Sequence, residues 1–376
     1  MTSPPNIDFS LLPDIRDKYP GDVVAQTASL RCQMPTAFDN HASSRSGLAG
    51  NGISVFVCAL RHLFVHVALK WRGDLRDTDN ALFRIIRHYD ERENPLLRFA
   101  WSDLGTDGAS LAVQDRTLEV IANHLLEANS LVADLSFRGL AESTLMHTTL
   151  FQRPPFQLYH PYYFSQPIED PDVAGDAWDL HDTRSHPAEV ARRSLITWDG
   201  QGDLGDLITR KFGVFHLADG KTRCLWLCNH PVVIRVLYSP PASDAPPPPP
   251  PSLSHITFDG LRARQEQLAP SGTIIHPPES HVRRYVLIVA VRLREHDEDR
   301  DLIHRYTIRG TEIPGPPDYP YANPHWTLGQ PGRQYMLFYS PVLKRPIGYG
   351  ARQDGNRLPS DGELAVGKKG MSNSSE

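Results

Sequence analysis

The chain has 376 residues, 40% of them hydrophobic and 22% charged, which is enough to bury a sizeable core. Its formal net charge of -5 argues against nucleic acid as a partner, because neutralising phosphates requires a basic face. No apolar run is long enough for a membrane span, and four cysteines in such a chain favour a reducing compartment, cytoplasmic or nuclear.

The first part of the chain is expected to be mainly helical. Residues 1–45 are punctuated by Pro, Asp, Asn and Ser and are predicted to form an irregular N-terminal arm with at most one short helix. A wide apolar stripe predicts a buried helix over 53–71, and a second helix is expected over 80–88. Apolar residues at helical spacing predict a third helix in GASLAVQDRTLEVIANHLLEA, which begins at Gly108.

The second part is expected to be rich in strands. Three β-rich runs, HPVVIRVLYSP from His230, RRYVLIVAVRLRE from Arg283 and QYMLFYSPV from Gln334, predict three strands. A Pro-rich insertion over 240–252 contains six consecutive prolines, which predict a stiff spacer or, alternatively, an SH3-type ligand. The tail over 351–376 is predicted to be disordered because it cannot bury enough apolar surface. Helices followed by strands indicate an α+β fold.

Several segments, in order, resemble the ubiquitin-specific proteases, the papain-like cysteine deubiquitinases. The stretch GLAGNGISVFVCALRHLF, from Gly47 to Phe64, is similar to the family's cysteine box. Similar motifs follow in the family's order: VQDRTLEVIANHLL with Gln114 and Asp115, YVLIVAVRL from Tyr285, HRY from His304, Trp326, and QYMLFY from Gln334. The resemblance implies a papain-like (USP-type) fold over 46–350, with a helical lobe followed by a mainly antiparallel β lobe.

The catalytic residues of that family are not matched. The cysteine box is one residue short, so the nucleophile falls on Ser54 or Val55, and Cys58 lies one helical turn beyond Ser54. Alignment on Tyr306 places Arg305 where the family has its histidine, and arginine cannot act as a general base at neutral pH.

The other two catalytic positions also depart from the pattern. The third catalytic residue falls near Gly329 or Gln330, and the oxyanion-hole asparagine falls on Ala49 or Gly50. The resemblance therefore implies a catalytically inactive pseudo-deubiquitinase that acts as a binding or scaffold module. Its expected partner is ubiquitin, a ubiquitin-like protein or another protein, and neither nucleic acid nor a membrane.

Two alternatives stay open. A bulge in the strand could turn His304 toward Cys58, which would give an active deubiquitinase with relocated residues. The same residues also fit structural roles: Cys58 in the core, His304 on a strand or at the surface, and Ser54 as a helix N-cap. The second alternative is an unrelated α+β interaction protein whose motifs match by coincidence.

Neither a cofactor nor a metal is predicted. Cys224, Cys228 and His230 are weak zinc candidates, because thiolates and imidazole are preferred zinc ligands but no second cysteine pair completes the tetrahedron. In a strand, Cys224 and Cys228 would share one face as neighbouring core residues. The acidic run REHDEDRD, which ends at Asp301, is predicted to be a solvated loop between two strands.

Overall fold

The computed structural model describes residues 7–36, 51–67, 89–127, 132, 134–168, 178–182, 187–218, 220–242, 251–262, 279–295, 300–317, 319, 321–322 and 325–342. Several predictions lie outside these residues: the helix over 80–88, most of the proline run, the tail over 351–376, and the positions of Ala49 and Gly50. The predicted domain boundaries after 45 and 350 also lie outside them.

The first part of the described chain is helical. Its helices are α1 (Ile15–Lys18), α2 (Val23–Cys32), α3 (Gly52–His66), α4 (Tyr89–Glu93), α5 (Pro95–Ala100), α6 (Gly108–Glu127), α7 (Phe137–Ala141) and α8 (Thr144–Met146). A π-helical turn over His147–Phe151 and a 3₁₀ turn over Pro154–Phe156 follow. The predicted helix that begins at Gly108 is confirmed as α6, with Leu118 and Ile121 on its buried face. Among the described helices, none has the length and apolar character needed to cross a membrane.

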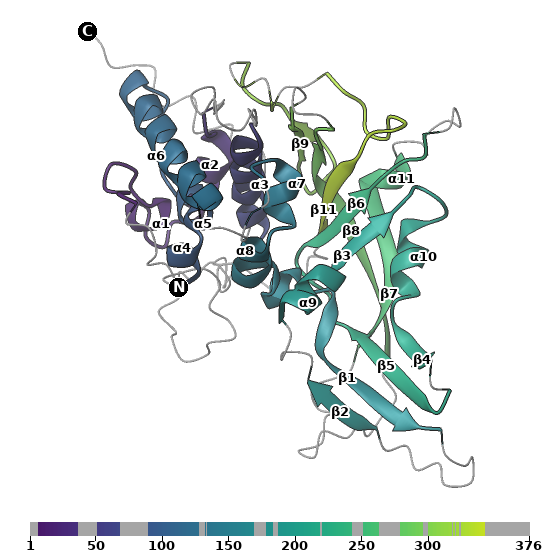
Figure 1. Ribbon diagram of the computed structural model, residues 1–376. Coiled ribbons are helices and arrows are strands. Elements are labelled where there is room, and N and C mark those ends of the chain that lie inside the picture. The colour runs from purple at the N-terminus through teal and green to yellow at the C-terminus, as the bar shows by residue number, and fades with distance from the viewer. Residues whose placement is uncertain are drawn as a thin grey trace, which may run out of the picture.

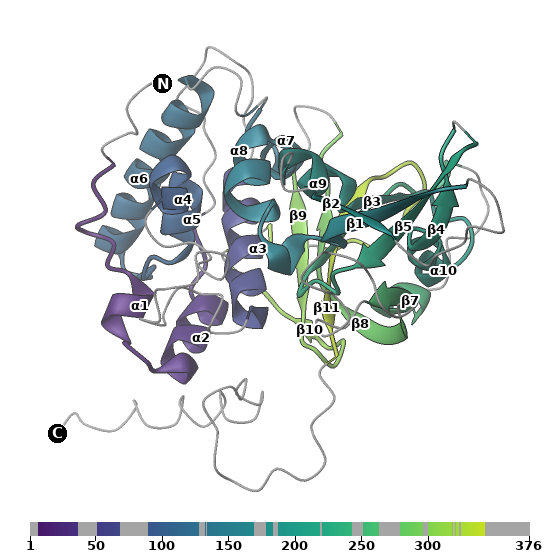
Figure 2. The same ribbon diagram turned by 90° about the horizontal axis from the view of Figure 1, so that it is seen from below.

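Helix α3 lies at the centre of the molecule, between the other helices and the strands (Figures 1 and 2). All of its residues from Gly52 to His66 are buried, which agrees with the wide apolar stripe of the sequence. Helices α2 and α5 pack on it from one side, and α7 and strands β8 and β9 also contact it (Figures 1 and 2). Any reactive group on α3 would therefore have to be uncovered by a specific opening in the surrounding layers.

The predicted irregular arm is corrected over residues 7–36, which form two capped helices and join the large core. The carboxylate of Asp14 accepts from the backbone N–H of Arg16 to begin α1, and that of Asp22 accepts from the N–H of Ala25 to begin α2. Leu30 is fully buried in the same cluster as α3. The prolines that indicate an irregular arm flank these helices and do not interrupt them.

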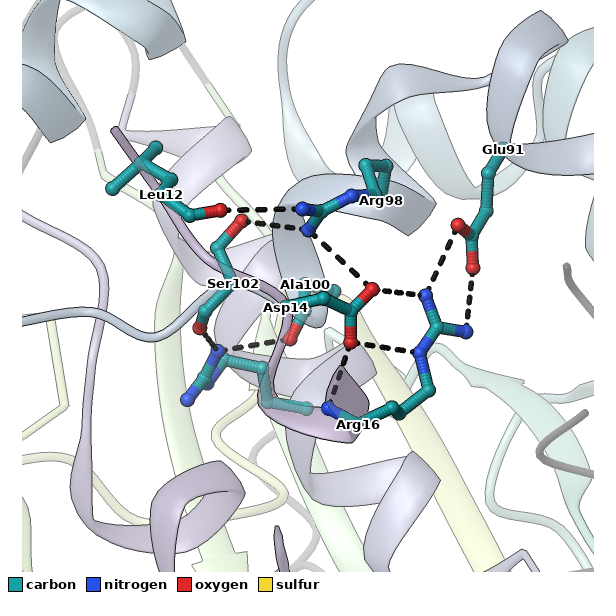
Figure 3. Close-up of polar contacts among 8 residues, drawn as sticks. Leu12, Asp14, Arg16, Glu91, Arg98, Ala100 and Ser102 are labelled. Atoms are coloured by element: carbon teal, nitrogen blue, oxygen red, sulfur yellow. Dashed lines mark hydrogen bonds and ion pairs between the residues drawn. The ribbon is translucent and has the colours of Figure 1, made fainter. Parts of the chain in front are cut away.

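A buried ion-pair network fixes α1 to α4 (Figure 3). The Arg16 guanidinium lies 2.6 Å from the Asp14 carboxylate and 2.8 Å from that of Glu91, and it stacks 4.7 Å from the ring centroid of Trp101. Arg98 also approaches Asp14, at 3.7 Å. Burial and the two carboxylates act in opposite directions on Arg16, and the carboxylates prevail, so the pKa of Arg16 is raised.

The second part forms two sheets. A four-stranded antiparallel sheet has the order β2-β1-β5-β4, from β1 (Tyr159–Pro167), β2 (Asp179–Asp182), β4 (Gly213–His216) and β5 (Thr222–Cys228). A seven-stranded sheet has the order β10-β9-β8-β11-β6-β3, with β7 on β8. Its strands are β3 (Leu195–Trp198), β6 (Ile234–Tyr238), β7 (His255–Arg262), β8 (Glu279–Arg292), β9 (Leu302–Tyr306), β10 (Glu312–Ile313) and β11 (Tyr335–Pro341). Helices α9 (Pro187–Arg193), α10 (Leu204–Thr209) and α11 (Pro251–Ser254) lie between strands in the sequence.

The three predicted strands are confirmed as β6, β8 and β11, which lie side by side in the larger sheet. Met336 of β11 pairs with Val291 of β8 on one side and with Leu237 of β6 on the other. Only β3 and β6 run parallel, so the described sheets are mainly antiparallel. The α+β class predicted from the order of helices and strands is therefore confirmed.

Candidate functional site

The first turn of α3 is closed by its neighbours. A Cβ atom added to Gly52 would lie 2.1 Å from the carbonyl oxygen of Leu135 and 2.7 Å from the nitrogen of Phe137, so only glycine fits there. The side chain of Asn51, which precedes the helix, forms two hydrogen bonds with the backbone of Asp301. The N-terminus of α3, where the resemblance places the nucleophile, is thus covered by α7 and by the start of β9.

Ser54 has a structural partner. It is fully buried, and its hydroxyl donates a hydrogen bond of 2.7 Å to the backbone carbonyl of Thr36. The N-cap position belongs to Asn51, so the predicted capping role of Ser54 is wrong, because Ser54 lies inside the first turn of the helix. Val55 is also fully buried.

Cys58 lies one turn further along α3, in the core. Only 2% of it is exposed, and burial raises the pKa of its thiol, although Arg305 and Arg61 act in the opposite direction. A reactive cysteine needs the reverse, a partly exposed thiol whose pKa is lowered. The surroundings of Cys58 therefore favour the neutral thiol.

Arg305 and His304 leave strand β9 on opposite faces, because successive side chains alternate across a strand. Arg305 is buried on the face toward α3 and donates to the carbonyl of Arg31 at 2.9 Å and to the sulfur of Met34 at 3.5 Å. The His304 ring lies on the other face, 4.3 Å from the ring centroid of Trp326, and its Nδ1 contacts the carboxylate of Glu312.

The geometry therefore brings Cys58 near Arg305 and not near His304. The pairing register of β9 with β8 runs without a shift from Leu302 to Arg305, so no bulge turns the His304 ring toward α3. The relocated dyad of Cys58 and His304 is not formed in this conformation. Gly329 and Gln330 lie in the turn near Trp326, where the N–H of Gln330 donates to the Tyr335 hydroxyl.

The zinc candidates do not converge. Cys224 and Cys228 are both buried on β5, and four residues of an extended strand separate their Cα atoms by about 13 Å, whereas two sulfurs bound to one zinc ion lie within about 5 Å. The Cys228 sulfur accepts from the backbone N–H of His230 at 3.3 Å, and burial raises the pKa of that thiol to about 12. Within the described part of the chain, no group of three potential ligands could hold a metal ion.

Asp301 is a site residue that the sequence analysis assigned to a solvated loop. It is fully buried, and its carboxylate accepts from the backbone N–H groups of Phe137 and Arg294 at 2.9 and 3.0 Å. Burial is the largest effect on the carboxyl and raises its pKa to about 6. The sequence alone did not reveal that Asp301 is buried, because it ends an acidic run. Its hydrogen bonds with Asn51, before α3, and with Phe137 of α7 distinguish it from the other acidic residues.

No sequence profile of a protein family matches this chain, and no curated protein matches it. It is similar to the structure of the Saccharomyces cerevisiae PAN2 pseudoubiquitin-hydrolase, with 13% identity and a TM-score of 0.29, over 82% of this chain and 88% of that one. It is also similar to the SAGA Ubp8/Sgf11/Sus1/Sgf73 DUB module bound to ubiquitin aldehyde, with 9% identity and a TM-score of 0.27, over 92% and 72%.

Likenesses with TM-scores this low do not define a fold. The mixed α+β architecture with mainly antiparallel sheets rests on the strand pairing of this chain itself. The papain-like arrangement implied by the sequence motifs stays a prediction.

Proposed function

We propose that this chain is a USP-like domain without hydrolase activity, a pseudo-deubiquitinase that binds ubiquitin or another protein. The order of motifs from Gly47 to Tyr339 supports the kinship. The packing of α3, which carries most of the cysteine-box residues, against β9, which carries HRY, supports it as well.

One observation carries the proposed loss of activity. The position of the family's nucleophile holds Ser54 or Val55, both buried, and the position of its base holds Arg305, which is buried and donates to the Arg31 carbonyl. Thiol-dependent hydrolysis needs a thiolate beside an imidazole and donors aimed at the oxyanion. Neither serine nor valine supplies a thiolate, and an arginine side chain cannot act as the general base at neutral pH.

Binding is tested by titrating the full chain with fluorescently labelled ubiquitin. We expect saturable binding, because recognition of a partner and cleavage of a bond use different residues. Ubiquitin lacking its C-terminal tail serves as the control that locates the contribution of the tail. The absence of binding at high micromolar concentration would remove ubiquitin as the ligand and leave another protein as the partner.

Activity is tested with ubiquitin that carries a C-terminal electrophile. We expect no covalent adduct with the wild-type chain, and none with Ser54→Cys, because the new thiol would still be buried and would still lack an imidazole partner. Labelling of the wild type that disappears in Cys58→Ala would contradict the proposal and favour an active deubiquitinase with relocated residues. An adduct that persists in Cys58→Ala would indicate non-specific alkylation of the exposed Cys32.

A further inference from the structure

The segment that follows α2 runs in an extended conformation across α3. Residue Gln33 has φ −88° and ψ 124°, and Met34 is restricted to extended conformations because Pro35 follows it. Met34 is 3% exposed and Thr36 is 9% exposed. Met34, Pro35 and Thr36 are buried without joining a sheet, so their backbone carbonyls need other partners.

Three buried side chains from separate parts of the chain hold the segment. Ser54 of α3 donates to the carbonyl of Thr36, and Tyr321 donates to that of Pro35. Arg305 of β9 donates to the sulfur of Met34 and to the carbonyl of Arg31, the second-last residue of α2. Side chains that bind backbone carbonyls recognise an extended main chain and not a particular side chain.

We propose that Ser54, Arg305 and Tyr321 form a binding site for an extended peptide, and that residues 33–36 of this chain occupy it. Ser54 and Tyr321 bind its main chain, and Arg305 binds the Met34 side chain. Two of the three donors stand where the resemblance places a nucleophile and a base. These positions hold the chain's own segment in place of a substrate. The proposal rests on the contacts themselves and does not depend on the proposed binding of ubiquitin.

The occupied site also covers Cys58. Ser54, Cys58 and Arg61 lie on one face of α3, because they are four and three residues apart. Ser54 donates to the Thr36 carbonyl and Arg61 donates to the Gln33 side chain, so Cys58 lies between the two contacts that residues 33–36 make with α3. Departure of these residues would remove the cover over Cys58 and break the contacts of Ser54, Tyr321 and Arg305 with the segment. A peptide from a partner and the segment 33–36 therefore compete for one site.

The first test removes one donor from the full-length chain. Tyr321→Phe deletes the hydroxyl bonded to Pro35, and Tyr285→Phe is the matched control, because its hydroxyl donates to the carbonyl of Pro231 elsewhere in the core at 3.0 Å. We expect hydrogen exchange of the amides of Gln33, Met34 and Thr36, and alkylation of Cys58 by N-ethylmaleimide, to rise at least tenfold in Tyr321→Phe. Both rates should stay within twofold of the wild type in Tyr285→Phe.

The second test asks whether the vacated site takes a peptide. Pro35→Gly loosens the segment while the three donors stay in place, so Cys58 should become reactive. A synthetic peptide of residues 31–38 carrying Cys32→Ser should then return the labelling rate of Cys58 to within twofold of the wild type. A peptide of scrambled sequence, with its proline moved, is the control for non-specific protection.

The proposal would be overturned by unchanged exchange at residues 33–36 in Tyr321→Phe. It would equally be overturned if the segment opened and Cys58 stayed unreactive, or if millimolar peptide gave Pro35→Gly no protection. Ser54→Ala is the second donor variant, and it should reproduce the effect of Tyr321→Phe at the same amides and the same thiol. Ubiquitin is absent from all of these measurements, so its failure to bind would not affect them.

Discussion

Asn51 and Asp301, 250 residues apart in sequence, form two hydrogen bonds that join the start of α3 to the start of β9. The Asn51 amide donates to the Asp301 carbonyl at 2.8 Å, and the Asp301 N–H donates to the Asn51 side-chain oxygen at 3.1 Å. The Asp301 carboxylate holds the first residue of α7 through the N–H of Phe137. One buried acid thus fixes the start of α3, and its protonation affects stability.

We expect Asp301 to give the unfolding free energy a specific pH dependence. Its pKa rises from 3.8 to about 6 on folding, so the folded chain binds this proton more tightly. The stabilisation is present at low pH and is lost as the pH rises through 6. In urea unfolding from pH 4.5 to 7.5, the wild type should lose about 2 kcal/mol relative to Asp301→Asn, which does not titrate. Parallel pH profiles for the two proteins would contradict this assignment.

Gly52 and Gly108 form a matched pair of substitutions. Gly52→Ala places a methyl group 2.1 Å from the Leu135 carbonyl, so α3 or α7 must shift, and we expect a loss of about 3 kcal/mol. Gly108→Ala, at the start of α6, meets nothing within 4 Å and should be neutral or stabilise by up to about 1 kcal/mol. Denaturant unfolding measures both. Equal changes in unfolding free energy for the two substitutions would show that the start of α7 does not pack closely against Gly52.

Arg305 is expected to act as a cap for α2. Arg31 is the second-last residue of that helix, so its carbonyl has no partner within the helix. Arg305→Met should destabilise the chain by about 2 kcal/mol, because a buried carbonyl loses a charged donor. Arg309→Met, at an exposed position close by, should change the unfolding free energy by less than about 0.5 kcal/mol. An unchanged unfolding free energy in Arg305→Met would mean that another group replaces Arg305 as the donor to the Arg31 carbonyl.

The ion pairs of α1 are expected to differ strongly in strength. Arg16→Met leaves the carboxylates of Asp14 and Glu91 buried without their shared cation, which should cost about 3–5 kcal/mol. Lys18 pairs with Asp103 but its side chain is 43% exposed, so Lys18→Met should cost less than about 1 kcal/mol. Thermal and denaturant unfolding would both report the difference. Similar losses would indicate that water reaches the Arg16 network.

Zinc is not expected to contribute to folding. The separation of Cys224 and Cys228 along β5 prevents both from binding one ion in this conformation. Incubation with EDTA should therefore leave the melting temperature unchanged, and added zinc should not raise it. A chelator-dependent fall in melting temperature, lost in Cys224→Ser, would show that the strand rearranges around a metal.

Much of the fold could be predicted from local patterns. The apolar stripe around Cys58 predicted a buried helix, helical spacing predicted α6, and β-branched runs predicted β6, β8 and β11. Strand β1 of the four-stranded sheet was missed, because it mixes aromatic and polar residues without a clear alternation. At most one short helix was expected before residue 45, because nearby prolines outweighed the caps at Asp14 and Asp22.

The sequence by itself determined which chemical groups are available at the expected catalytic positions. A serine or a valine stands where the resemblance requires cysteine, and an arginine stands where it requires histidine; folding does not change which functional groups these side chains carry. Only the tertiary structure decided what those groups contact: it set His304 and Arg305 on opposite faces of β9, buried Asp301, and brought residues 33–36 onto α3. These partners lie far apart in the sequence. Local conformational propensity depends on neighbouring residues, so it does not specify which distant carbonyl a buried donor will bind.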